Sequence, residues 1–217
     1  MVNRTTEDYV KSIYALGKES ARVSTSALAA QLGVADASIT GMLRRLSRAG
    51  LVRYERYRGV SLTPYGRRLA LKIVRRHRLW EMFLMKFLEY SWDEIHAEAE
   101  RLEHVTSDAL EERLDRALGF PVADPHGDPI PTADGRLGPQ HDSRLSDAAP
   151  GSVVTVARIS DADPEVLKRA STLGIGLQRK IHVKEQIAVD GSLRVRVGSK
   201  ERFISAKLAE NIYVEEG

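Results

Sequence analysis

The sequence contains no cysteine. This absence excludes disulfide bonds, thiolate catalysis and every zinc or iron–sulfur site that depends on cysteine ligands. A metal ion bound by this chain would therefore be held by nitrogen and oxygen atoms.

The chain also lacks a long hydrophobic run. No stretch approaches the roughly 20 apolar residues that a membrane-spanning helix needs, and residues 1–4 lead into polar sequence instead of the apolar core of a signal peptide. We therefore expect no membrane partner and a cytoplasmic location. With 42% hydrophobic and 29% charged residues in a chain of 217, the composition is that of a globular protein with two or three small domains.

Motifs of several common enzyme chemistries are missing as well. The sequence has no HExxH motif, no glycine-rich phosphate-binding loop and no recognisable arrangement around a nucleophile. It therefore offers no catalytic residues, and we expect a protein that is not an enzyme.

Positive charge is concentrated at the front of the chain. Residues 1–90 hold 17 Lys and Arg against 7 Asp and Glu, whereas the remainder holds 16 against 23. A basic region of this kind is typical of a protein that binds a phosphate backbone. Composition alone does not distinguish DNA, RNA and an anionic membrane.

The front of the chain has the pattern of a helix-turn-helix. Residues 5–17 place apolar side chains on one stripe and predict a first helix. Ser24 and Thr25 can cap a short helix through Leu32, and Gly33 supplies a tight turn. The second helix of the motif then starts at Ala35 or Asp36. The helix that ends at Leu32 and this one flank the turn at Gly33, as in a helix-turn-helix.

Two strands and a long helix are expected next. Residues 51–55 and 60–63 alternate like strands on either side of a basic tip at 56–59, which is typical of a β-wing. Thr63 followed by proline predicts the start of a helix that runs to about Tyr90.

The rest of the chain divides into helix, connector and strands. Ser91 to Glu94 form a capping box for a helix that we expect to run to about Leu118. Six prolines mark residues 119–150 as a loop-rich connector. The last part suits a small β-barrel with one short helix, with strands predicted at 152–159, 180–189, 193–197 and 212–215 and the helix near 164–172.

Two consecutive predicted helices each carry a face of histidine and glutamate. These residues are His77 and Glu81 on the first helix and, within an arc of about 100° on the second, His96, Glu100, Glu103 and His104. Either face alone is typical of a solvated surface, but imidazole and carboxylate groups converging from packed helices make metal sites in helical bundles. We therefore predict a shared metal site and expect no role for His126, His141 and His182.

Several motifs together carry a family resemblance. They are TTEDY at 5–9, the winged-helix pattern, RHRL at 76–79, IHAEAERLEHV at 95–105 and GDPIP at 127–131. With them the chain resembles the diphtheria toxin repressor family of iron- and manganese-dependent regulators, most specifically up to residue 131 and weakly after 150. The resemblance implies a mainly α protein with small β regions: an N-terminal winged helix-turn-helix DNA-binding domain at 1–70, a helical dimerisation and metal-binding domain at 71–140, and a C-terminal SH3-like β-barrel at 151–217.

By position, the resemblance implies two metal sites. The primary site would comprise Asp8, Glu100, Glu103 and His104. The second site would comprise His77, Glu81 and His96, with oxygen ligands supplied from Asp161, Asp163 and Glu165. For the two aspartates of that stretch, simple capping of the helix that begins at Pro164 remains an alternative.

The resemblance also bears on the choice of metal. Asp8 and Glu100 stand where iron-type members carry Met and Cys, and they match the manganese-type members. Oxygen ligands suit Mn²⁺ and Fe²⁺ better than soft-ligand metals, so either ion is the expected cofactor, with Mn²⁺ favoured. Lys11 replaces a glutamate of the two-domain manganese regulators, which argues against a closely spaced pair of ions.

An anion site of the iron-type members is altered in this sequence. Arg78 is retained from that site, but Asp124 and Asp128 replace its other two residues and would repel an anion.

The partner implied is palindromic double-stranded operator DNA bound by a homodimer. Small residues at the start of the second helix of the motif favour apolar contacts with thymine methyl groups and recognition of DNA shape, and nearby arginines can reach phosphates. The small residues are Ala35, Ala37, Ser38, Thr40 and Gly41, and the arginines are Arg44, Arg45, Arg48, Arg56 and Arg58.

The favoured function is a metal-dependent repressor of metal-homeostasis genes, and two alternatives remain. A metal-dependent hydrolase could use the His and Glu cluster, because an open coordination position can activate water. The basic front and the winged helix would then have no purpose. A DNA-binding protein with a purely structural metal is the third interpretation.

Overall fold

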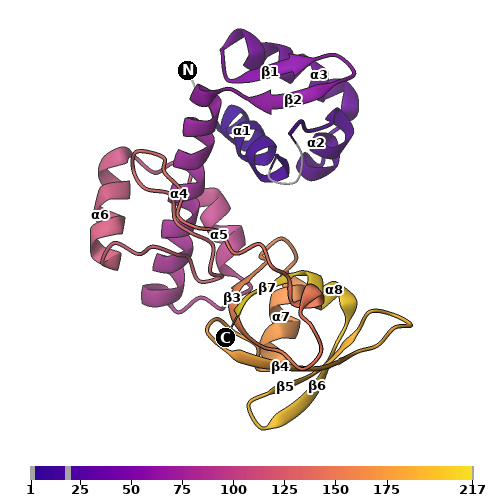
Figure 1. Cartoon of the computed structure of the whole chain (residues 1–217). Helices are drawn as coiled ribbons and strands as arrows, with labels where there is room; N and C mark the ends of the chain where they lie inside the picture. The colour runs from indigo at the N-terminus through magenta and orange to yellow at the C-terminus, as the bar shows by residue number, and fades with distance from the viewer. Residues whose placement is uncertain (1–2, 18–20, 217) are drawn as a thin grey trace. The chain divides into compact units, whose positions relative to one another are not determined.

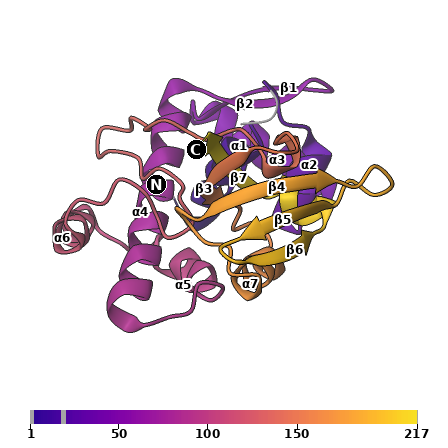
Figure 2. The same ribbon diagram turned by 60° about the horizontal axis from the view of Figure 1, so that its bottom comes forward.

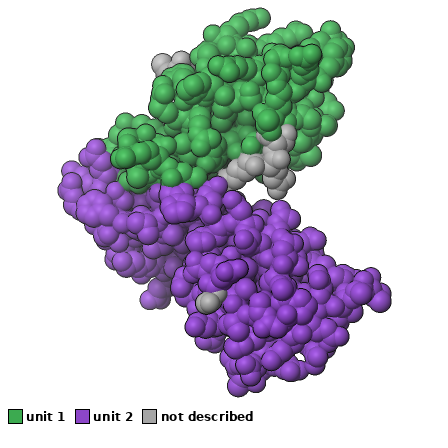
Figure 3. All heavy atoms as spheres, in the orientation of Figure 1, with its two compact units in different colours: residues 1–77, 101–111, 131–137 green, residues 78–100, 112–130, 138–217 purple. Residues whose placement is uncertain are grey.

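The computed structural model describes residues 3–17 and 21–216, which form two compact units (Figure 3). Unit 1 comprises residues 1–77, 101–111 and 131–137, and unit 2 comprises residues 78–100, 112–130 and 138–217. The long helix α4, Pro64–Leu88, contributes to both units.

Unit 1 contains the predicted helix-turn-helix (Figure 1). Its helices are α1 Arg4–Leu16, α2 Thr25–Leu32 and α3 Asp36–Arg48. Gly33, at φ 63°, takes the left-handed conformation that closes α2, and Ser24 caps the start of that helix by accepting from the amide of Ala27. Apolar side chains from all three helices are buried together, namely Val10, Ile13, Leu28, Ile39, Leu43 and Leu46.

The predicted wing follows α3 directly. Strands β1 Val52–Glu55 and β2 Gly59–Leu62 pair antiparallel, from Val52 opposite Leu62 to Glu55 opposite Gly59. The hydroxyl of Thr63 accepts from the amide of Gly66 at 3.0 Å, as expected for the cap of α4.

The prediction of one helix up to Leu118 was wrong, because the structure has two. Helix α5 spans Ile95–Leu102, and helix α6 spans Asp108–Leu118. The hydroxyl of Thr106 donates to the Leu102 carbonyl at 2.7 Å, and the hydroxyl of Ser107 accepts from the Leu110 amide at 3.2 Å, so these two residues end one helix and start the next. Glu103 and His104 therefore lie in a turn and not on a helix face.

Unit 2 contains an antiparallel sheet with the strand order β6-β5-β4-β3-β7 (Figure 2). The strands are β3 Val153–Ile159, β4 Lys180–Gln186, β5 Leu193–Val197, β6 Lys200–Ile204 and β7 Ile212–Glu216. Strand β6 and the short helix α8, Ala206–Glu210, were not predicted. Within the described residues the ladder stays open between β6 and β7, so barrel closure stays a prediction.

Helix α7, Pro164–Thr172, lies where the sequence predicted it. Asp163 caps it, with Oδ1 accepting from the amide of Glu165 at 3.0 Å. The helix buries Val166, Leu167 and Ala170 in the same core as the sheet. Between α6 and β3 the only regular element of the described chain is the short 3₁₀ turn Leu145–Asp147, which agrees with the predicted connector. Over the described residues, no helix has both the length and the apolar character needed to cross a membrane.

Candidate metal and DNA-binding sites

In unit 1, three predicted ligands come together around the imidazole of His104. Nε2 of His104 lies 2.9 Å from Oδ1 of Asp8 and 3.4 Å from Oε1 of Glu103. Asp8 comes from α1, and the other two come from the turn after α5. The side chains of Glu103 and His104 are buried, whereas Asp8 is one-third exposed.

The contacts of His104 fit a bound cation. Its Nδ1 lies 2.7 Å from Oε2 of Glu7, a carboxylate oxygen that can only accept a hydrogen bond, whereas its buried Nε2 makes no hydrogen bond among the described residues. In the neutral ring the proton therefore belongs on Nδ1. The lone pair on Nε2 then faces the oxygens of Asp8 and Glu103. Three electron-pair donors converge there, and a metal-binding histidine characteristically donates its other N–H to a carboxylate in this way. Sequence analysis had not singled out Glu7.

Lys11 lies beside the same carboxylate. Its ammonium donates to Glu103 at 2.9 Å and 2.7 Å and lies 3.2 Å from Nδ1 of His77. The same Nδ1 lies 2.6 Å from Oε2 of Glu103. Lys11 thus places a positive charge at the position where, by the resemblance, two-domain manganese regulators carry a glutamate.

Unit 2 brings together part of the predicted second site. Nδ1 of His96, on α5, lies 3.3 Å from Oε1 of Glu81, on α4, and 3.6 Å from Oδ2 of Asp161. Glu100, one helical turn after His96, has Oε1 at 3.9 Å from Nε2 of that histidine. Glu81 is fully buried, and the His96 and Asp161 side chains are each about one-third exposed.

Asp163 and Glu165 have other contacts. Besides capping α7, Asp163 pairs with Lys207 at 2.8 Å, and the hydrogen bond from Lys207 holds the pKa of the Asp163 carboxyl below its usual range. Glu165 pairs with Lys168 at 3.1 Å. The structure thus brings Asp161 to His96 and gives Asp163 the capping role.

The residues predicted to contact DNA are largely accessible on unit 1. Ala35, Ala37, Ser38 and Gly41 are exposed, and Thr40 is half-buried. All five predicted arginines, Arg44, Arg45, Arg48, Arg56 and Arg58, are exposed as well.

A cavity of about 470 Å³ lies between the helix-turn-helix and the wing. Arg44, Arg56 and Arg58 line it, together with Arg22 and Tyr57, which sequence analysis did not select. Arg22 pairs with Glu55 at 2.5 Å, and its hydrogen bond lowers the pKa of the Glu55 carboxyl. The arginines around this cavity suit an anion such as a phosphate group.

Three family models match successive parts of the chain. The model described as the iron dependent repressor N-terminal DNA binding domain matches residues 1–60, and the model of its metal binding and dimerisation domain matches residues 63–132. The FeoA domain model matches residues 143–216.

Individual proteins agree with these matches. The diphtheria toxin repressor of Corynebacterium jeikeium is 32% identical over 164 residues, which cover 74% of this chain and 68% of that protein. The chain belongs to the diphtheria toxin repressor family. The iron-dependent repressor IdeR of Mycobacterium tuberculosis is 39% identical over 127 residues, 58% of this chain but only 55% of the length of IdeR. A manganese-dependent transcriptional repressor solved in complex with manganese aligns with a TM-score of 0.91 and 40% identity, covering 98% of this chain and all of that one.

The relatives found are metal-dependent transcriptional repressors, which are DNA-binding proteins and not enzymes. The resemblance linked Arg78 to an anion site of the iron-type members. In unit 2 the Arg78 guanidinium pairs with Asp124 at 3.2 Å and Asp128 at 2.9 Å, and it donates to the Pro129 carbonyl. Burial works against the charged guanidinium, but the carboxylates of Asp128 and Asp124 outweigh it and raise the pKa of Arg78. The two replacements therefore engage the arginine that the resemblance linked to an anion.

A third group of possible ligands was missed from the sequence. Glu81, Asp124 and His126 are all buried, and each offers a ligand atom within 4.8 Å of the others. His141 and His182 belong to none of the groups found among the described residues. His126 stood in a segment that looked like a plain connector, and only its neighbours in the fold give it a site.

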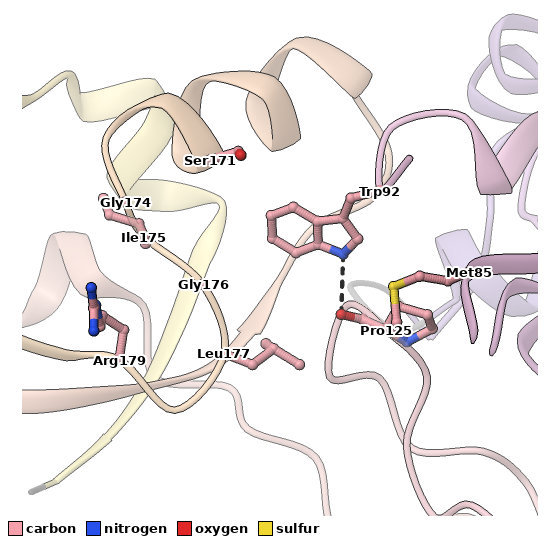
Figure 4. Close-up of a pocket in the computed structure, with 9 residues that line it drawn as sticks. All are labelled: Met85, Trp92, Pro125, Ser171, Gly174, Ile175, Gly176, Leu177 and Arg179. Carbon is pink, nitrogen blue, oxygen red and sulfur yellow. Dashed lines mark hydrogen bonds between the residues drawn. The ribbon is translucent and has the colours of Figure 1, made fainter. Parts of the chain in front are cut away.

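The ring of His126 is held by Trp92. The two rings stack with centroids 5.5 Å apart, and the indole N–H of Trp92 donates to the Pro125 carbonyl at 3.1 Å. Trp92 and Pro125 also line a cavity of about 540 Å³, as Figure 4 shows, across from Gly176 and Leu177.

Proposed function

We propose that this chain is a metal-dependent transcriptional repressor of metal-homeostasis genes that binds operator DNA as a homodimer, with Mn²⁺ or Fe²⁺ as its cofactor. The observation that carries the proposal is the convergence of Asp8, on the first helix of the DNA-binding motif, with Glu103 and His104. The manganese-bound structure that aligns along nearly the whole chain supports the choice of cofactor.

The proposed domains follow the sequence prediction. A DNA-binding domain would span residues 1–70, a dimerisation and metal-binding domain residues 71–140, and an SH3-like barrel residues 151–217. The successive matches of the three family models support this division.

The proposed mechanism is a coupling free energy between metal and DNA. Helix α1 carries Asp8 on one side and buries Val10 and Ile13 in the core that holds α2 and α3. A cation bound by Asp8, Glu103 and His104 would accept electron pairs from two carboxylate oxygens and one ring nitrogen. It would thereby fix α1 against the turn after α5. Helix α3, whose first residues would face the DNA bases, would then be held in one position.

Glu100 is proposed as the fourth primary ligand, by its position in the family motif. For the second site the proposed ligands are His77, Glu81, His96 and Asp161. A set of imidazole and carboxylate groups without sulfur suits Mn²⁺ and Fe²⁺.

One titration separates the repressor from its alternatives. Operator affinity would be measured with Mn²⁺, with Fe²⁺ and without metal, while folding is followed by circular dichroism. A repressor gains affinity with metal at constant fold, whereas a structural site changes the fold itself. Substrate turnover would identify a hydrolase, which the family assignment argues against.

Homodimer formation is supported by apolar side chains on unit 2. Phe87, Leu88, Phe120 and Val122 are from about one-half to four-fifths exposed. Exposed large apolar side chains are typical of an interface when they form one patch. A two-fold dimer predicts a palindromic operator, since paired half-sites mirror the symmetry of the protein.

The wing arginines should contribute to affinity without sequence preference. Arg56 and Arg58 are exposed at the tip of the wing, where they can reach phosphates. Each contact with a phosphate releases a counterion, so each Arg→Ala variant should reduce the slope of log K against log salt by about 1. The slopes would be measured by fluorescence anisotropy at several salt concentrations. Arg144→Ala, outside the wing, is the control and should keep the parental slope. If the slope is also unchanged in both wing variants, the wing does not contact DNA phosphates.

Asp161 and Asp163 should respond differently to substitution. Asp161→Asn should weaken metal binding at the second site, because its carboxylate lies beside His96, whereas Asp163→Asn should leave metal affinity unchanged. The Asp163 variant should instead make the metal-free protein less stable at neutral pH. Folding lowers the pKa of this carboxyl, so the stability that it contributes is present at neutral pH and is lost as pH falls through the folded-state pKa. Calorimetric metal titration and thermal unfolding check the two effects. Equal metal affinity in both variants would exclude Asp161 as a ligand.

A further inference from the structure

The buried group Glu81, Asp124 and His126 lies in unit 2 and has no role in the function proposed so far, apart from Glu81. The side chains of Glu81 and His126 have no exposed surface, and Asp124 is 4% exposed. Each of the three residues offers an oxygen or nitrogen within 4.8 Å of the others. This is the spacing of ligands that share one metal ion.

The protonation of His126 leaves an electron pair available for a ligand. Nε2 lies 3.2 Å from the Trp92 carbonyl, which can only accept, so Nε2 carries the proton. In the neutral ring Nδ1 is then the acceptor, and this atom is buried with no hydrogen-bond partner among the described residues. A buried acceptor without a donor costs free energy, typically about 1–3 kcal/mol, unless something binds it. Donation of the other ring N–H to a backbone carbonyl is also how proteins orient a metal-binding histidine.

The charges in the group favour a cation. The carboxylates of Glu81 and Asp124 are both buried, and Arg78 pairs with Asp124 at 3.2 Å. Arg78 is shared with Asp128, so a single guanidinium faces several carboxylates. A divalent ion would compensate the charge of these two buried carboxylates.

Hydrogen bonds and close backbone packing hold the loop that carries two of these residues. Oδ1 of Asp124 accepts from the amides of His126 at 2.8 Å and Asp128 at 2.9 Å, and the His126 carbonyl accepts from the amide of Ile159 on β3. Gly127, at φ 91°, packs so closely against the Ala157 carbonyl that a Cβ would collide with it. The Asp124 carboxylate and the backbone of His126 are therefore held in place by these contacts.

We propose that Glu81, Asp124 and His126 bind a divalent transition-metal cation, at a third site that shares Glu81 with the second site. Nδ1 of His126 and one oxygen from each carboxylate are the protein ligands. One nitrogen and two oxygens suit Mn²⁺, Fe²⁺ or Zn²⁺. Glu81 also contacts His96, and a carboxylate can bind one ion through each oxygen, so this residue links the new site to the second site.

The experiment counts Mn²⁺ ions bound per chain of the full-length, chelator-treated protein, by calorimetry and by electron paramagnetic resonance of unbound Mn²⁺. Asp124→Asn keeps an oxygen for the two amides but lowers the ligand charge, and His126→Phe keeps a ring against Trp92 but removes the nitrogen. Each variant should bind one ion fewer than the parent chain. His141→Phe, at a histidine outside the group, should bind the parental number, and Asp161→Asn should keep this ion.

Fluorescence gives a second readout at the site itself. In a Trp80→Phe background Trp92 is the only tryptophan, and Mn²⁺ bound beside His126 should quench it. The quenching should disappear in Asp124→Asn and remain in His141→Phe. If His126→Phe fails to fold, Asp124→Asn decides by both measurements.

Parental stoichiometry and parental quenching in Asp124→Asn would overturn the proposal and leave Asp124 as a buried acid. Failure of the proposed function would look different. Operator binding would then not respond to metal, while the ion at His126 would still be counted.

Discussion

Replacing His104 with alanine is expected to abolish the response of operator binding to metal while the fold is retained. The imidazole faces the oxygens of Asp8 and Glu103 through Nε2, so its loss removes the nitrogen ligand from the group that connects α1 with the turn after α5. Couplings between two sites are typically about 1–3 kcal/mol, so metal should tighten operator binding of the parent chain about 5- to 150-fold and that of the variant not at all.

The measurement is operator affinity with and without saturating Mn²⁺, compared with circular dichroism of the same samples. Glu103→Ala should lose the response too, but it also takes the partner of Lys11 away, so its stability must be compared separately. His141→Ala is the matched control, because that histidine lies in the connector outside the groups of possible ligands. A His104→Ala protein that still gains affinity with Mn²⁺ to the parental extent would show that the primary site has been assigned wrongly.

The helix-turn-helix, the wing and α7 could be predicted because local rules determine them. Gly33 supplies a left-handed turn, Thr63 with Pro64 opens α4, and Asp163 with Pro164 opens α7, so each boundary is encoded by adjacent residues. The unpredicted break between α5 and α6 depends on Thr106 and Ser107, which can also occupy the interior of a helix. The hydrogen bonds of these two side chains to nearby backbone atoms cannot be predicted from the hydrophobic pattern.

The candidate sites show the same division. The spacing of His96, Glu103 and His104 drew attention to them, because periodicity and motif operate over a few residues. The contact of Glu7 with His104 joins residues almost a hundred positions apart, and the approach of His126 to Glu81 depends on a loop fixed against β3. Such contacts follow from the tertiary fold, so no local pattern in one sequence announces them.

Lys11→Met is expected to destabilise the metal-free protein and to leave the metal-bound protein nearly as stable as the parent. The ammonium of Lys11 bonds both oxygens of Glu103, a carboxylate with no exposed surface. Methionine keeps the length of the side chain but removes the charge, so Glu103 is left buried without that partner. Breaking a buried ion pair from one side typically costs about 3 kcal/mol.

Metal should reverse this loss, because a cation bound by Asp8, Glu103 and His104 takes over the compensation of Glu103. The variant should also bind Mn²⁺ more tightly than the parent, since no ammonium competes for the carboxylate. Lys72→Met is the matched control: Lys72 pairs with Asp108 at 2.6 Å, but both side chains are well exposed, and such surface pairs contribute at most about 1 kcal/mol.

Urea unfolding with and without Mn²⁺ measures both effects, and calorimetry gives the affinity. If Lys11→Met and Lys72→Met lose the same small amount of stability, or if Mn²⁺ stabilises Lys11→Met no more than the parent, Lys11 and the metal do not share Glu103. If Lys11 and the metal do share Glu103, the ammonium of Lys11 takes the place of the metal and stabilises the metal-free protein. Lys11 would then set the metal concentration at which the repressor responds, since every ion that binds must first displace the ammonium from Glu103.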